Sequence, residues 1–167
     1  QGRLATPGYL RAMGIPLRRG RDLAPADHAE APRVLLANEA AAKLLWPGED
    51  ALGHALVIGT RFGFGGDRAN GTVVGIVGDA REMRVAREAL PTVYLPHAQG
   101  PVGFMGLALR TSGDPTLLVA AAREQARALD PDVPVFSTLT MEQRLAESVA
   151  TQRFYMLLLA VFAIAAL

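Results

Sequence analysis

Residues 31–50 read APRVLLANEAAAKLLWPGED, and this stretch decides the fold more clearly than any other. The apolar run 34–37 lies between Pro32 and Asn38, which is typical of a buried strand. Asn38 is a good helix cap, and 46–48 (Trp-Pro-Gly) would end the helix. The apolar positions expected on one face of that helix are Ala40, Ala41, Leu44 and Leu45.

A short helix and a loop are expected before this stretch. Thr6 followed by Pro7 predicts an N-cap and a first helical turn, and Gly14 followed by Pro16 would end that helix. Residues 17–32 mix charges, prolines and small residues without a helical or alternating period. We therefore expect a loop over 17–32.

Three strands are expected after residues 31–50. The runs 55–59, 72–77 and 93–95 are rich in β-branched and apolar residues and are bounded by glycine or proline. The glycine-rich residues 61–71 precede a strand rather than a helix, so they do not fit a phosphate-binding loop. A hairpin turn is the better interpretation of 61–71.

The last third has the clearest periodicity. Asp114 and Pro115 predict the cap and first turn of a helix that ends at Leu129, between strands at 104–110 and 133–138. This spacing favours two strands of one sheet with the helix packed across it. Thr140 and Gln143 have capping-box spacing, which predicts a further helix to about Val149.

The chain ends in FYMLLLAVFAIAAL, residues 154–167, which are apolar on every face. A helix of this length spans about 21 Å, short of the roughly 30 Å hydrocarbon core of a bilayer. We interpret residues 151–167 as the N-terminal part of a membrane-spanning helix that contacts lipid through 154–167. The alternative is a soluble α/β binding or enzymatic domain with a buried C-terminal helix.

The composition excludes several functional classes of protein. The 167 residues carry 17 Lys and Arg against 16 Asp and Glu, so the chain lacks the basic excess of a nucleic-acid-binding protein. The absence of cysteine excludes thiolate metal sites and cysteine nucleophiles. These counts favour an ordinary domain with its own hydrophobic core.

No constellation of catalytic or ligating residues stands out, and we expect no catalytic, cofactor-binding or metal-binding residue. The histidines lack metal-ligand spacing, and no serine lies in a G-x-S-x-G turn. The three histidines are His28, His54 and His97, and the serines are Ser112, Ser137 and Ser148. The carboxylates of Glu49, Asp50 and Asp79 give no reason to select a pair. The charge cluster at Arg18, Arg19, Arg21 and Asp22 predicts local Arg–Asp pairs in a solvated loop.

Several phrases together resemble the extracytoplasmic region of ABC transporter permeases of the MacB/FtsX type, with their MacB-like periplasmic core domain. In order, the phrases are TPGYLRAMGIPLRRGRD (6–22), APRVLLANEAAAKLLWPGEDALGH (31–54), VVGIVGDAR (73–81), PTVYLPHAQ (91–99), DPDVPV (130–135) and TMEQ (140–143). The apolar run follows where the second membrane helix of such a permease would begin. The resemblance covers nearly the whole chain.

The resemblance implies an α+β fold with two lobes. Residues 1–14 would end a first porter-like segment, 15–90 would form an inserted, mostly β lobe, and 91–150 would return to the porter-like lobe. It also implies a non-enzymatic protein without cofactors, because ATP hydrolysis belongs to a separate ATPase.

The implied setting is the bacterial inner membrane, with this domain on the periplasmic or extracytoplasmic side. The expected partners are an ABC ATPase subunit, a second permease half or homodimer, and a periplasmic adaptor, but no nucleic acid. The expected role is to couple cytoplasmic ATP hydrolysis to periplasmic conformational change for export or efflux. A regulatory FtsX-like permease that recruits a cell-wall hydrolase is the alternative.

Overall fold

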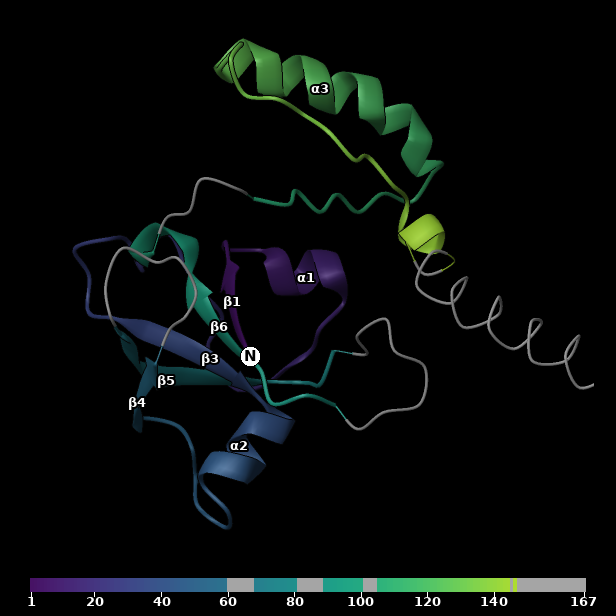
Figure 1. Ribbon diagram of the computed structural model, residues 1–167. Helices are drawn as coiled ribbons and strands as arrows, with labels where there is room; N and C mark the ends of the chain where they lie inside the picture. Colours follow the sequence, from purple (N-terminus) through teal and green to yellow (C-terminus); the bar gives the residue numbers. More distant parts are fainter. Residues whose placement is uncertain (60–67, 81–88, 101–104, 145, 147–167) are drawn as a thin grey trace, which may run out of the picture. The chain divides into compact units, whose positions relative to one another are not determined.

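A computed structural model describes residues 1–59, 68–80, 89–100, 105–144 and 146. These residues form two compact units, one up to residue 109 and one from residue 110 onward. In the first unit the elements are β1 Gly2–Ala5, α1 Tyr9–Met13, β2 Leu17–Gly20, β3 Val34–Asn38, α2 Glu39–Leu45, β4 Ala55–Gly59, β5 Arg68–Val77, β6 Val93–Pro96 and the 3₁₀ turn η1 His97–Gln99. The second unit contains the 3₁₀ turn η2 Pro115–Leu117 and α3 Leu118–Leu129 (Figure 1).

The first unit is built on one mixed, six-stranded sheet. Its order is β1-β6-β3-β5-β2, and β4 joins the same side of β5 as β2. β3 runs parallel to β5 and antiparallel to β6, while β1 runs parallel to β6. The predicted α+β fold class is confirmed, and so are the predicted strands of β3, β4, β5 and β6. The predicted division at residues 15–90 and 91–150 stays a prediction.

Both faces of the sheet are covered, which explains the unbroken apolar run of β3. Val34 and Leu36 pack with Leu10 of α1 on one face. Leu35 and Ala37 pack with Ala41 of α2 on the other. Figure 1 shows α1 above the sheet and α2 below it. A strand buried on both faces loses the apolar–polar alternation of a half-exposed one.

The side chain of Asn38 ends β3 and begins α2. Its Oδ1 accepts hydrogen bonds from the backbone N–H of Ala41 (2.9 Å) and of Thr92 (2.8 Å). Its Nδ2 donates to the carbonyl of Leu90 at 3.0 Å, and its backbone N–H donates to the carbonyl of Thr92 at 2.9 Å. Asn38 is buried, so these bonds satisfy polar groups that water does not reach. The predicted cap is confirmed, and it also fixes the segment that enters β6.

The expectation of a loop over 17–32 is wrong at its start, because residues 17–20 form β2. The pairing steps from Leu17↔Val77 to Arg19↔Ile76, so Arg18 is an extra residue, or β-bulge. All four residues of β2 are exposed, and backbone pairing with β5 holds the strand in place. Close contact with β5 requires glycine at two positions. A Cβ on Gly75 would lie 2.3 Å from the carbonyl oxygen of Arg21, and one on Gly20 would lie 2.3 Å from that of Val74.

Both short helices differ in detail from the predictions. α1 begins at Tyr9 with Gly8 at the N-cap, without a side-chain cap from Thr6, and ends as predicted at Gly14. In α2, Ala41 faces the sheet as predicted. Leu44 and Leu45 are 65% and 42% exposed, so they do not belong to its buried face. Small alanines at the contact let α2 lie close to the sheet, and the larger leucines then point elsewhere.

In the second unit, α3 confirms the predicted helix and its limits. Asp114 Oδ1 accepts from the backbone N–H of Thr116 at 2.8 Å, and Pro115 lies in the first turn of η2. Residues 105–110 and 133–138 are not assigned to strands, so the two flanking strands were predicted wrongly for the described residues. Their apolar residues suggested strands, but a strand also needs a neighbouring strand, which an apolar run does not by itself supply.

The predicted capping box is confirmed. Thr140 N–H donates to Gln143 Oε1 at 2.8 Å, and Gln143 N–H donates to Thr140 Oγ1 at 3.1 Å. Residues 141–144 are helical. The hairpin turn expected within 61–71 lies mostly outside the described residues, and Arg68–Gly71 belong to β5. The apolar run 154–167 also lies outside them, and none of the described helices is long and apolar enough to cross a membrane.

Replacing Gly75 by alanine should destabilise the first unit. The new methyl group would overlap the backbone of Arg21, so we expect a loss of about 1–3 kcal/mol in the free energy of unfolding. Gly2→Ala is the matched control, because its Cβ would lie in ordinary contact at 3.9 Å from Leu95. Urea unfolding followed by the fluorescence of Trp46, the sole tryptophan, measures both variants. Equal midpoints for the two variants would contradict the close approach of β2 and β5.

Candidate functional site

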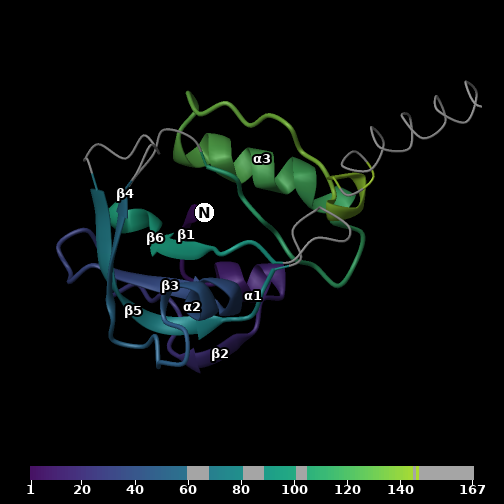
Figure 2. The same cartoon turned by 60° about the horizontal axis from the view of Figure 1, so that its bottom comes forward.

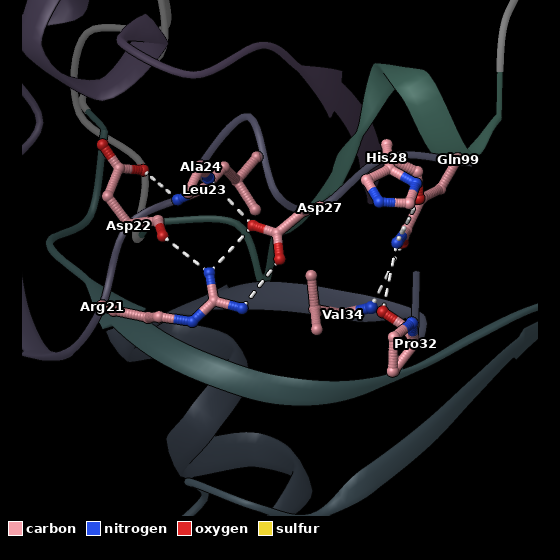
Figure 3. Close-up of polar contacts among 9 residues, drawn as sticks. All are labelled: Arg21, Asp22, Leu23, Ala24, Asp27, His28, Pro32, Val34 and Gln99. Atoms are coloured by element: carbon pink, nitrogen blue, oxygen red, sulfur yellow. Dashed lines mark hydrogen bonds and ion pairs between the residues drawn. The ribbon is translucent and has the colours of Figure 1, made fainter. Parts of the chain in front are cut away.

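The segment 21–33 between β2 and β3 is held by a half-buried ion pair. Arg21 donates to both carboxylate oxygens of Asp27, with Nη1–Oδ2 at 2.8 Å and Nη2–Oδ1 at 2.7 Å. The same Oδ2 accepts from the backbone N–H of Ala24 at 2.8 Å. Asp27 is 5% exposed, whereas the Arg21 side chain is 49% exposed. Figure 3 shows the guanidinium facing the carboxylate across the loop.

These contacts shift the charges of the pair. The hydrogen bonds from Arg21 lower the pKa of Asp27 below its usual value, against the opposing effect of burial. The same hydrogen bonds raise the pKa of Arg21. Both shifts favour the charged forms that make the ion pair.

The far end of the segment is held by Gln99 of η1. Its Nε2 donates to the backbone carbonyls of His28 (3.2 Å) and Pro32 (3.1 Å), and its Oε1 accepts from the N–H of Val34 at 3.2 Å (Figure 3). One amide thus joins the loop, the start of β3 and η1. We call the side chains of Arg21, Asp27 and Gln99 the polar clip.

Two further arginines of the predicted charge cluster are also paired. Arg18 Nε lies 3.6 Å from Glu39, at the start of α2, and Arg19 Nη2 lies 2.6 Å from Asp50, beyond its end. In a regular strand, side chains of neighbouring residues point to opposite faces. The bulge at Arg18 places Arg19 opposite Ile76, and the side chain of Ile76 packs on the face of the sheet that α2 covers. Arg18 and Arg19 can therefore both reach acids on that face.

The prediction of local Arg–Asp pairs in a solvated loop holds for Arg21, whose partner is Asp27. It is wrong for Arg18 and Arg19, which lie in β2 and pair with the distant acids Glu39 and Asp50. Asp50 also accepts a hydrogen bond from the N–H of Leu52, which is the main reason that its pKa is lowered. Exposed pairs of this kind contribute little stability. They link β2 to the start of α2 and to the loop beyond its end.

The three histidines are not brought together into a site. His28 lies in the loop, and its carbonyl accepts from Gln99. The ring of His54 lies 5.5 Å from that of Trp46, and its Nε2 is 3.8 Å from Glu49. The Nε2 atom of His97 is buried without a hydrogen-bond partner in the described structure. Within the described ranges, no three His, Asp or Glu side chains could hold a metal ion.

The remaining candidates are equally separate. Asp79 accepts from the backbone N–H of Ala40 at 3.0 Å, near the start of α2, and so acts as a second helix cap. Ser137 has a positive φ of 55° in the second unit, and Ser112 lies before α3. Ser148 lies outside the described residues. The residues that sequence reasoning missed, Asp27 and Gln99, are common polar types without a distinguishing motif.

Comparison with known proteins gives the family and the fold. The model of the family described as MacB-like periplasmic core domain matches residues 1–130. The periplasmic region of MacB from Actinobacillus actinomycetemcomitans is similar at 19% identity and a TM-score of 0.51, over 74% of this chain and 54% of that structure. The extracellular domain of the noncanonic ABC-type transporter YknZ from Gram-positive bacteria is 19% identical, with a TM-score of 0.48, over 76% of this chain and 61% of that one. This chain thus covers less than two thirds of either structure. No curated protein matches it.

Replacing Asp27 by asparagine should weaken the polar clip and reduce the dependence of stability on acid pH. It removes the buried carboxylate of a charge-assisted pair, so we expect a loss of about 1–3 kcal/mol at neutral pH. Because the pKa of Asp27 is lowered in the folded state, its stabilisation is present above the usual carboxyl pKa and fades as pH falls through the lowered value.

The matched control is Asp50→Asn, which removes the exposed partner of Arg19. Urea unfolding between neutral pH and pH 3 distinguishes the two variants. If Asp50→Asn proved as destabilising as Asp27→Asn, or if the latter kept the full acid dependence of the parent, the clip would not be the stabilising contact described above.

Proposed function

This chain belongs to the family of MacB-like periplasmic core domains, and from that membership we propose that it is the extracytoplasmic domain of an ABC transporter permease. The family match over residues 1–130 is the observation that carries the proposal. The domain would stand outside the bacterial inner membrane. A cytoplasmic ABC ATPase would act on this domain through the membrane helices of the permease.

The proposed work is mechanical rather than chemical. The first unit has a sheet packed on both faces, and packed cores of this kind move as bodies rather than deform continuously. The side chains of Asn38, Asp79 and Asp114 cap helices, and those of the polar clip tie the loop between β2 and β3. This use of polar groups supports a domain that passes on movement and presents surfaces to partners.

The connection to the membrane would run through the helix that begins at Met141. Thr140 and Gln143 fix its first turn through the reciprocal hydrogen bonds of the capping box. If the helix continues into the apolar run 154–167, a tilt in the bilayer would be transmitted to the unit that carries Met141. The proposed direction of coupling is from cytoplasmic ATP hydrolysis to movement outside the membrane.

We propose export or efflux as the process served, with a periplasmic adaptor and a second permease half or a second copy as partners. The resemblance to FtsX-type permeases supplies the alternative, in which the same domain recruits a cell-wall hydrolase. Affinity capture of the membrane-embedded protein with its neighbours separates the two. An adaptor favours export, whereas a hydrolase favours regulation.

Membrane anchoring is tested by removing the apolar run. The full chain, incorporated into phospholipid vesicles, should stay with the vesicles through an alkaline carbonate wash. A chain that ends at Ala150 should stay folded, become more soluble and be released. Its urea unfolding midpoint should match that of the full chain, because the proposal places the run in lipid rather than in a protein core.

Two outcomes would contradict this. Release of the full chain by carbonate would remove the membrane anchor from the proposal. Unfolding of the shortened chain would show that the last helix belongs to a buried core, as in the alternative of a soluble domain.

A further inference from the structure

β4 forms a free edge of the sheet that differs from the other described edges. It pairs with β5 in continuous register, from Ala55↔Thr72 to Gly59↔Arg68, and no other described strand adjoins it. Its five residues, ALVIG, carry no charge. Figures 1 and 2 both show β4 at the margin of the sheet.

The other two edges carry features that oppose pairing with another molecule. β2 has a bulge at Arg18 and two adjacent arginines, and β1 contains Arg3. Bulges and charged side chains are the usual means by which natural sheets protect their edges. β4 has neither feature, and among the described strands only β5 pairs with it.

The hydrogen bonds of β5 show which groups of β4 point outward. Val73 N–H donates to the carbonyl of His54, so residue 73 of β5 faces the β4 side. By alternation Gly71 and Ala69 face the same side, opposite Leu56 and Ile58. The backbone N–H and C=O groups of 55, 57 and 59 therefore point away from β5.

The side chains of β4 leave this edge accessible. Leu56 and Ile58 pack against the cluster under α2 and are partly buried. Ala55 is exposed on the opposite face, and Val57 beside it is 58% exposed. A partner strand can thus approach without displacing a core residue.

We propose that β4 is a homodimer contact, in which β4 of one molecule pairs antiparallel with β4 of a second copy about a two-fold axis at Val57. Val57 would then lie opposite Val57, and Ala55 opposite Gly59 of the partner, so small residues meet at both ends. This deepens one part of the proposed function, the pair of permease subunits, and rests on it.

A second copy fits this edge better than a foreign strand does. An antiparallel strand pair is self-complementary under two-fold symmetry, which is the commonest symmetry of soluble oligomers. Self-pairing of β4 opposes no like charges, whereas self-pairing of β2 would bring arginines together. β4 also lacks any charged side chain that would select an unlike partner.

Cysteine cross-linking tests the contact and its register, because the natural chain contains no cysteine. Val57→Cys is introduced into the full 167-residue chain in phospholipid vesicles, and the sample is oxidised with copper phenanthroline. Directly opposed residues in a hydrogen-bonded antiparallel pair lie about 5.5 Å apart between Cα atoms, within the range of a disulfide. We expect covalent dimers on non-reducing gels.

The matched control is Ala55→Cys, on the same strand and with the same outward orientation. In the proposed register two copies of residue 55 are offset by four residues, roughly 13 Å along the strands. Ala55→Cys alone should therefore give roughly tenfold less dimer than Val57→Cys. A mixture of Ala55→Cys and Gly59→Cys molecules should restore the cross-link.

The proposal is overturned if Val57→Cys gives no more dimer than Ala55→Cys, or if the mixture gives no more dimer than either variant alone. Carbonate washing of the same vesicles reports anchoring separately. Anchored protein without the register-specific cross-link would refute the β4 contact and leave the membrane domain standing. Loss of anchoring with the cross-link intact would support the β4 contact and refute the membrane anchor.

Discussion

The side chain of Asn38 joins three parts of the first unit at one buried point. Its carboxamide caps α2 and accepts from Thr92, while it donates to Leu90. A single amide therefore determines where β3 stops, where α2 starts and how the chain enters β6. An aspartate could accept the same bonds, but it would lack the donor for Leu90 and would bring a charge into the core. Only a side chain with both a donor and an acceptor satisfies this geometry.

Side chains also bind backbone groups at the other end of β3. There the side-chain amide of Gln99 ties η1 to the loop, and the ion pair between Arg21 and Asp27 closes that loop on itself. Polar groups in the first unit are thus placed at the ends of strands, where backbone groups would otherwise lack partners. These side chains therefore serve to satisfy and connect the backbone of the first unit.

Local signals in the sequence predicted β3, α2 and α3 because each carries its own cap or stop. Asn38, Asp114 and the Thr140–Gln143 pair act on residues two or three positions away, so sequence order alone reveals them. β2 could not be predicted in this way. Its residues are exposed and it forms only because β5 lies beside it, more than fifty residues later in the chain.

The buried face of α2 and the partner of Arg21 were missed for related reasons. Periodicity grouped Leu44 with Ala41, but the close approach of a short helix to a sheet favours the small side chain. The cluster of arginines and aspartates predicted pairing, and the fold then chose Asp27 because the loop turns back at that point. Residue type and spacing limit which side chains can be buried or paired, and the three-dimensional packing determines which of them are.

The bulge at Arg18 has an evolutionary consequence. Removing one residue there would restore strict alternation and turn one arginine to the face away from α2, leaving either Glu39 or Asp50 without its cation. Relatives with a one-residue gap in this strand should therefore have replaced one of those two acids as well. The length of this segment and the identity of two distant carboxylates are thereby expected to change together.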